Sequence, residues 1–211
     1  MITAELLIFD LDGTIADTLT DISNSVNFAL TQSGFACLKE TQIVKYIGSG
    51  ARQLFQDILK KPDVDEILQI YLKHYSENFL NYTKLYPGTG EILEYYKNKK
   101  KVVISNKTDK FVNGILEGLN ISSCFDSVIG AGKMEKLKPD PQSVISMMKK
   151  FNIAPDKTII IGDGINDIQA GNNAEIHTCA AGYGFTPKKQ LMKYSPEFYI
   201  DSLIELKKIV C

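Results

Sequence analysis

Apolar residues run without interruption from Leu6 to Phe9 and stop at Asp10, and Asp12 follows two positions later. A short continuous apolar run is typical of a strand that is buried on both faces of a sheet. Two carboxylates directly after such a strand are costly to desolvate unless a positive group lies between them. Ligands bind at the carboxyl ends of strands in an open parallel sheet, so this stretch predicts a site that holds a hard cation.

The pattern then changes to helical spacing. Between residues 17 and 82, apolar residues recur three and four positions apart, beginning at Leu19 and Ile22, and no strand pattern occurs. An insertion of this size can fold as a small domain of its own. We predict an all-helical domain over residues 17–82, inserted after the first strand, and a core domain made of residues 1–16 and 83–211.

Short apolar runs alternate with helical spacing in the rest of the chain. The further strands predicted from these runs are 102–104, 127–129, 158–161, 176–180 and 198–200. Strands that alternate with helices indicate a parallel sheet with right-handed crossovers. The predicted fold class is therefore α/β, with a Rossmann-like parallel sheet core and an all-helical cap.

Composition narrows the range of functions. The chain has 211 residues, 44% of them apolar, which is enough for a sizeable core. A net charge of −1 argues against binding of nucleic acid or of a membrane surface through bulk charge. We find no apolar run of membrane-spanning length, no signal-peptide pattern, and no cysteine pair at disulfide-motif or zinc-ligand spacing. These features predict a cytoplasmic protein whose partner is neither a nucleic acid nor a membrane.

Polar side chains follow three of the predicted strands, and a lysine precedes a predicted helix. The residues concerned are Asp10, Asp12 and Thr14, then Ser105 and Asn106, then Lys138, and finally Asp163 and Asp167. The carboxyl ends of parallel strands meet at one edge of a sheet, so these side chains are expected to converge. Four carboxylates in one pocket repel one another strongly, and a divalent cation such as Mg²⁺ would offset that repulsion.

Such a site suits phosphoryl transfer. One carboxylate can attack phosphorus to form an aspartyl-phosphate, and a second can move the proton of the leaving group and of water. Ser105, Lys138 and nearby backbone N–H groups suit phosphate oxygens.

The chain resembles the haloacid dehalogenase superfamily of phosphatases over almost its whole length. The motifs that carry the resemblance are Asp10-Leu11-Asp12-Gly13-Thr14, Ser105 after Val102-Val103-Ile104, Lys138-Pro139-Asp140-Pro141, and Gly162-Asp163 with Asp167. The helical segment 17–82 looks like the cap domain that some members of this superfamily insert after the first strand.

The resemblance implies a role for each motif residue at the end of the first strand. Asp10 would be the nucleophile and a Mg²⁺ ligand. Asp12 would be the general acid/base, and its backbone carbonyl would also bind Mg²⁺. Thr14 would help to orient Asp12 and belongs to the predicted phosphate-binding set. The presence of Asp12 favours phosphate esters, because dehalogenases of the same superfamily lack this acid.

The later motifs complete the implied site. Ser105 and Asn106 would bind the transferring phosphoryl group. Lys138 would hold Asp10 and the phosphate together by its charge. Asp163 would be a Mg²⁺ ligand, and Asp167 would support the metal directly or through water.

The predicted substrate depends on residues of the cap. Gly48-Ser49-Gly50 lets the backbone approach a ligand closely, and Arg52, the only arginine in the chain, suits a carboxylate. This segment resembles the phosphoglycolate phosphatase branch of the superfamily, which makes Gly50 and Arg52 candidates for contacting a small anionic substrate such as 2-phosphoglycolate. The alternative is a simple turn between cap helices, with Arg52 in solvent.

The same sequence features are compatible with functions other than a phosphatase. A phosphosugar mutase similar to β-phosphoglucomutase, or a pyrophosphatase, would use the same motifs. Outside enzymes, a receiver-like signalling domain or a non-catalytic phosphate-binding protein would keep a similar cluster. The partner expected in every enzymatic case is a small phosphorylated metabolite, and the sequence does not indicate an oligomeric state.

Overall fold

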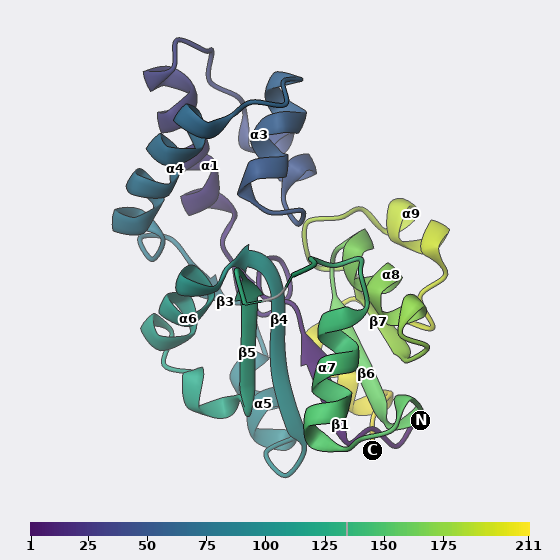
Figure 1. Ribbon diagram of the computed structural model, residues 1–211. Coiled ribbons are helices and arrows are strands. Elements are labelled where there is room, and N and C mark those ends of the chain that lie inside the picture. The colour runs from purple at the N-terminus through teal and green to yellow at the C-terminus, as the bar shows by residue number, and fades with distance from the viewer. Residues whose placement is uncertain (134) are drawn as a thin grey trace.

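A six-stranded parallel sheet forms the centre of the protein, in a computed structural model that describes residues 1–133 and 135–211 (Figure 1). Its strands are β1 (Leu6–Phe9), β4 (Lys100–Thr108), β5 (Ser127–Ala131), β6 (Thr158–Gly162), β7 (His177–Ala181) and β8 (Phe198–Ile200). Their order across the sheet is β5-β4-β1-β6-β7-β8. The strand β1 therefore lies between β4 and β6, and the predicted parallel α/β fold is confirmed.

Helices cover both faces of this sheet. They are α5 (Thr89–Tyr95), α6 (Asp109–Gly118), α7 (Gln142–Phe151), α8 (Ile165–Asn173), α9 (Lys188–Leu191) and the 3₁₀ segments η2 (Ser122–Cys124), η3 (Pro155–Lys157), η4 (Met192–Tyr194) and η5 (Leu203–Lys208). Successive side chains of a strand point to opposite faces. Leu7 and Phe9 accordingly pack with α5, α6 and η5, whereas Leu6 and Ile8 pack with α7 and α8. Both faces are buried, which explains the uninterrupted apolar run in β1.

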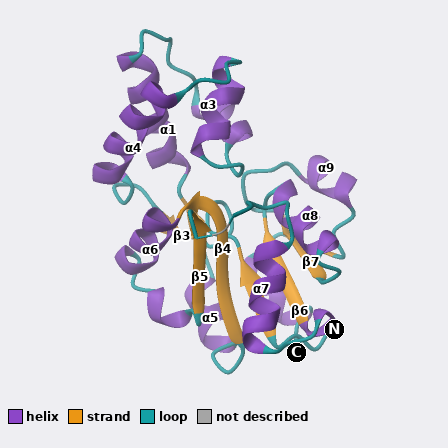
Figure 2. Cartoon of the chain, viewed as in Figure 1, coloured by secondary structure: helices purple, strands orange, loops and turns teal. Residues whose placement is uncertain are grey.

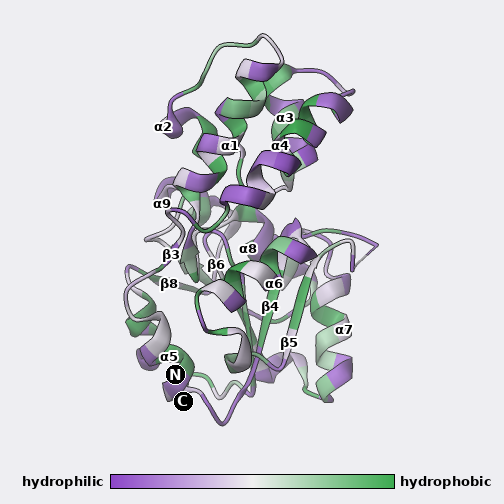
Figure 3. Cartoon of the chain, turned by 90° about the vertical axis from the view of Figure 1, so that its left-hand side faces the viewer, coloured by the Kyte–Doolittle hydropathy of each residue, from purple (hydrophilic) through white to green (hydrophobic). Residues whose placement is uncertain are grey.

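A group of helices alone makes up the other part of the chain (Figure 2). It contains α1 (Leu19–Gln32), α2 (Glu40–Ile43), η1 (Val44–Tyr46), α3 (Ala51–Leu59) and α4 (Asp65–Asn78). Their apolar faces turn toward one another (Figure 3) and form a separate core around residues such as Val26, Phe55 and Tyr75. The predicted insertion of helices after the first strand is thus confirmed. The exact limits of a cap domain at residues 17 and 82 stay a prediction.

The structure differs from the sequence prediction at a few elements. The strands β2 (Ala16–Asp17) and β3 (Lys84–Leu85) pair antiparallel where the helical part leaves and rejoins the core. Two residues per strand are too few for a period-two pattern to reveal. The strand β4 continues to Thr108 through a register shift after Ile104, so it includes Ser105 and Asn106 instead of ending before them. After β8, the chain ends in the 3₁₀ segment η5 and not in an α-helix.

Within residues 1–133 and 135–211, no helix combines the length and the apolar character needed to cross a lipid bilayer.

Asp21 joins the two chain segments that connect the helical part to the core. It lies in α1 and is almost fully buried. Its carboxylate accepts hydrogen bonds from the backbone N–H groups of Tyr82 and Thr83 and from the Thr83 hydroxyl, at 2.8–3.1 Å. A buried carboxylate with several donors holds these two segments side by side.

We expect Asp21→Ala to lower the free energy of unfolding by about 2–4 kcal/mol, because it leaves buried N–H groups without an acceptor. Urea denaturation measures this change. Glu66→Ala, on the exposed side of α4, is the control and should change stability little. Equal stability of the two variants would show that the Asp21 contacts do not hold the connection.

Candidate active site

Asp10 lies directly after β1, at the middle of the sheet edge where the strand ends converge. Its backbone N–H donates to the carbonyl of Ile161 in the neighbouring strand β6, at 3.0 Å. Oxygen atoms of Asp10, Asp163 and Asp167 lie within 4.8 Å of one another, and all three residues are buried. The structure therefore brings together three of the four carboxylates that the sequence singled out.

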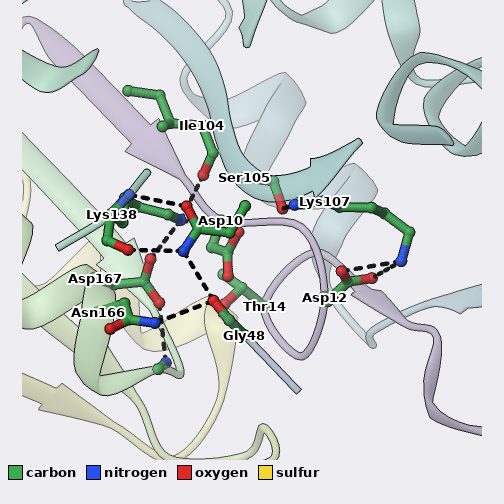
Figure 4. A network of polar contacts seen from close by, with 12 residues as sticks. Asp10, Asp12, Thr14, Gly48, Ile104, Ser105, Lys107, Lys138, Asn166 and Asp167 are labelled. Atoms are coloured by element: carbon green, nitrogen blue, oxygen red, sulfur yellow. Dashed lines mark hydrogen bonds and ion pairs between the residues drawn. The ribbon is translucent and has the colours of Figure 1, made fainter. Parts of the chain in front are cut away.

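Lys138 supplies the positive charge inside this cluster (Figure 4). Its Nζ lies 3.0 Å from Asp10 Oδ1 and 2.5 Å from Asp167 Oδ1, and it donates to the carbonyl oxygen of Ile104 at 2.5 Å. Its side chain is only 1% exposed. One ammonium thus faces two carboxylates directly while Asp163 completes the acidic cluster, so negative charge remains in excess.

Burial and mutual repulsion change the proton affinities of these groups. Burial raises the pKa of Asp10 from 3.8 to about 7; the charge of Asp167 adds to the rise and Lys138 opposes it. Burial also raises the pKa of Asp163 well above its ordinary value, and Asp10 adds to that effect. Burial alone would lower the pKa of Lys138, but Asp10 and Asp167 raise it above its usual range.

The turn after β1 positions Asp163. The Thr14 hydroxyl donates to Asp163 Oδ1 at 3.1 Å and accepts the Asp163 N–H at 3.0 Å. Gly13 has a φ of +81°, and a Cβ at this position would lie 2.3 Å from Asp163 Oδ2. The turn therefore needs glycine for both its backbone conformation and its space. The expectation that Thr14 orients Asp12 is wrong in this structure, because the Thr14 hydroxyl is engaged with Asp163.

Asp12 is oriented by other residues. Thr18 donates to Asp12 Oδ1 at 2.6 Å, and Lys107 Nζ donates to both Asp12 oxygens, at 2.9 and 3.0 Å. Figure 4 shows Asp12 and Lys107 apart from the cluster of Asp10, Lys138 and Asp167. Asp12 therefore contributes no side-chain oxygen to the three-carboxylate group.

A cavity of about 50 Å³ opens onto Asp10 and Asp12. Core residues and helices of the inserted part both line it. The lining includes Ser105, Asn106 and Lys107 of the core and Gly48, Gly50, Tyr71 and Tyr75 of the inserted part. The cavity therefore lies between the acidic cluster and the helical part of the chain.

The Gly48–Gly50 segment is fastened to the core. The Asn106 amide donates to the Gly48 carbonyl at 2.9 Å, and Asn166 donates to the same oxygen at 3.1 Å. A Cβ on Gly50, whose φ is +87°, would lie 3.2 Å from the Asn106 carbonyl oxygen. The close approach expected from the glycines occurs here, although it is an approach to the core backbone.

The Asn106 side chain positions Lys138. It accepts the Lys138 N–H at 2.9 Å and donates to the Lys138 carbonyl at 2.8 Å, besides its bond to Gly48. These contacts occupy the side-chain amide, and phosphate binding at Asn106, which was expected of backbone N–H groups, stays a prediction. Ser105 is buried and lines the cavity as predicted.

Arg52 does not reach the cavity. Its guanidinium pairs with Asp65 at 2.6 Å, and its side chain is 55% exposed. The structure thus agrees with the alternative interpretation, a solvated residue at the start of α3. Lys107, Thr18 and Asn166 also belong to the site, although they were not predicted from the sequence. Of these, Lys107 carried a signal, because it directly follows Ser105 and Asn106 in the same strand end.

The acidic cluster fits a divalent cation. Asp10 Oδ1 is buried and, among the described residues, makes no hydrogen bond, although the Lys138 ammonium lies 3.0 Å away. Carboxylate oxygens are the ligands that Mg²⁺ prefers, and excess negative charge favours its binding. Asp10, Asp163 and Asp167 are the side chains that could hold it.

Comparisons with known proteins agree with this geometry. The profile of a family described as haloacid dehalogenase-like hydrolase matches residues 7–181. The phosphoglycolate phosphatase of Aquifex aeolicus is 34% identical over 207 residues, which cover 97% of this chain and 96% of that protein. The phosphoglycolate phosphatase of Haemophilus influenzae strain Rd is 29% identical, with 98% of each chain covered. A crystal structure of a predicted phosphoglycolate phosphatase from Haemophilus somnus has a TM-score of 0.92 at 28% identity and covers 99% of each chain.

We expect saturating Mg²⁺ to raise the Tm by about 5 °C or more relative to protein in EDTA, because the ion offsets repulsion that exists only in the folded state. Thermal denaturation measures the shift. Asp163→Asn should lose most of it, whereas Asp156→Asn, an exposed acidic residue away from the cluster, should keep it. The same increase in Asp163→Asn and in the unsubstituted protein would place the ion elsewhere.

Proposed function

The chain belongs to the haloacid dehalogenase-like hydrolases, and on this basis we propose that it is a Mg²⁺-dependent phosphatase of a small phosphate monoester, 2-phosphoglycolate. The observation that carries the proposal is the buried cluster in which Asp10 meets Lys138, next to a cavity that also exposes Asp12. A nucleophile, a neutralising cation and a second acid are all present at one place.

In the first step, an oxygen of Asp10 attacks phosphorus and the bond between phosphorus and the ester oxygen breaks. The carboxyl group of Asp12 gives its proton to the leaving oxygen, so that the alcohol departs neutral. Ser105 and the charge of Lys138 stabilise the phosphoryl oxygens during the transfer.

In the second step, Asp12, now ionised, takes a proton from water. The water oxygen attacks the phosphorus of the aspartyl-phosphate, the bond to Asp10 breaks, and inorganic phosphate leaves. Asp10, Asp163 and Asp167 would hold Mg²⁺, whose positive charge would reduce the repulsion between the nucleophile and the phosphate.

The choice of 2-phosphoglycolate has two supports. Relatives that cover nearly the whole chain carry the name phosphoglycolate phosphatase. The cavity is small, about 50 Å³, which favours a compact substrate over a phosphosugar. We further propose that residues 17–82 act as the cap that closes this cavity in the cytoplasm of the cell.

Phosphate release from 2-phosphoglycolate in the presence of Mg²⁺ is the expected activity. Asp10→Asn should lower kcat at least about 1,000-fold, because the amide cannot act as the nucleophile. The control Asp156→Asn should keep full activity. Activity retained by Asp10→Asn would refute the mechanism.

The same assay separates the remaining enzymatic alternatives. Pyrophosphate and β-glucose 1-phosphate belong in the panel, with products identified by phosphorus NMR. Phosphate returned to a sugar would identify a mutase, and preferential hydrolysis of pyrophosphate would identify a pyrophosphatase.

Arg52→Ala should leave kcat/KM for 2-phosphoglycolate within about twofold, because an exposed ion pair contributes little. Steady-state kinetics of the two proteins check this. A tenfold or larger increase in KM would instead mean that Arg52 leaves Asp65 and enters the site when substrate binds.

A further inference from the structure

Lys107 is a buried cation that none of the steps above uses. Its side chain is only 7% exposed, and its Nζ donates to both oxygens of Asp12. The same ammonium lies 4.8 Å from the centre of the Tyr75 ring. Among the described residues that line the cavity, Lys107 is the only one with a cationic side chain. The Asp12 carboxylate offsets the cost of burying this charge, and it occupies only part of the donor capacity of the ammonium.

Apolar side chains form one part of the wall of the cavity into which Lys107 is built. They are Ile22, Ile47, Ala51, Leu54, Leu72 and Phe111. In low-dielectric surroundings an ion pair is stronger than at an exposed site. A ligand anion that reached Lys107 would therefore be recognised mainly by this one charge.

Tyr75 offers a second polar group without a partner. It is 1% exposed and lines the cavity, and its hydroxyl makes no hydrogen bond within the described part of the chain. Buried hydroxyl groups are normally hydrogen-bonded, and an orphaned one beside a cavity points to a polar ligand. The Tyr75 ring lies against the Lys107 ammonium, so the unpartnered hydroxyl and the ammonium belong to neighbouring side chains of the cavity wall.

We propose, on the basis of the proposed function, that Lys107 selects substrates that carry a carboxylate, with the Tyr75 hydroxyl as a second donor. A residue of the core would then bind the non-phosphate end of the substrate. The ammonium passes from Asp12 toward the substrate carboxylate when the ester binds.

The other nearby cations do not meet this need. The Lys138 ammonium has three N–H bonds, and it already faces oxygens of Asp10, Asp167 and Ile104 within 3.0 Å. Arg52 is exposed and paired with Asp65. Lys107 bonds only to the two Asp12 oxygens within the described residues, so it has a donor to spare.

The transfer would also release Asp12, because Lys107 Nζ would no longer donate to its two oxygens. An ester without a carboxylate leaves Lys107 on Asp12, whereas a carboxylate gives the ammonium another partner. Substrate selection and the release of Asp12 are thus one event.

The test compares 2-phosphoglycolate with 2-hydroxyethyl phosphate, in which CH₂OH replaces the carboxylate. We expect the unsubstituted protein to prefer 2-phosphoglycolate. Lys107→Gln should lower kcat/KM for 2-phosphoglycolate by about 10- to 100-fold, the loss of one charged hydrogen-bonded contact. For 2-hydroxyethyl phosphate, the same variant should lose a clearly smaller factor in kcat/KM, because this ester has no carboxylate for Lys107 to bind, so the preference for 2-phosphoglycolate should fall.

Two further variants complete the design. Lys110→Gln removes the same charge from an exposed position at the start of α6 and should leave the preference intact. Lys107→Arg retains the buried charge, which protects the fold if Lys107→Gln is unstable, and should still prefer the carboxylate. Thermal denaturation of each variant shows that it is folded.

Several results would overturn the inference. An equal loss on both esters in Lys107→Gln would mean that Lys107 acts only through Asp12. Loss of the preference in Lys107→Arg, with 2-hydroxyethyl phosphate still hydrolysed, would also contradict it. An unsubstituted protein that hydrolyses both esters equally refutes the role of Lys107 but leaves a phosphatase. No phosphate release from any ester refutes the proposed function, and the inference with it.

Discussion

The repulsion among three buried carboxylates is the constraint on which this site depends. Asp10 follows β1 whereas Asp163 and Asp167 both follow β6, and one ammonium, from Lys138, offsets part of their charge. The sheet order makes this arrangement possible, because β1 lies between β4 and β6 although long stretches of sequence separate them. The apolar residues that bury β1 on both faces fix Asp10 in place, and the same burial makes a compensating cation necessary.

Much of this could be predicted from sequence, for a physical reason. An apolar run that ends in an acid marks a buried strand with a functional end, and Asp10 and Asp163 both follow that pattern. Contacts within the turn could not be predicted, because the path of a few loop residues decides which carboxylate a hydroxyl reaches. Thr14 therefore bonds to Asp163, while Thr18, four residues later, bonds to Asp12.

The two candidate carboxylate-binding cations show a similar limit. Arg52 was a candidate because it is the only arginine and follows a glycine-rich turn. The sequence does not reveal that its guanidinium pairs with Asp65, at the start of α4. Nothing in the amino-acid composition distinguishes Lys107 from the other lysines of the chain. Its importance comes from burial and from the Asp12 carboxylate, which a strand, a turn and their register place beside it. Chemical type thus favours Arg52 as the residue that binds a carboxylate, whereas position in the fold favours Lys107.

Asn106 shows how the helical part and the chemical centre are connected. One amide side chain bonds to both backbone groups of Lys138 and also donates to Gly48, which belongs to the inserted segment. Asn166, in α8, donates to that same Gly48 carbonyl. The Gly48–Gly50 segment, which lines the cavity, is therefore joined through Asn106 to the residue that neutralises Asp10. A movement of the helical part away from the core must break the two bonds to Gly48, whereas the bonds between Asn106 and Lys138 lie within the core. One amide side chain thus both supports Lys138 and holds the inserted segment against the core.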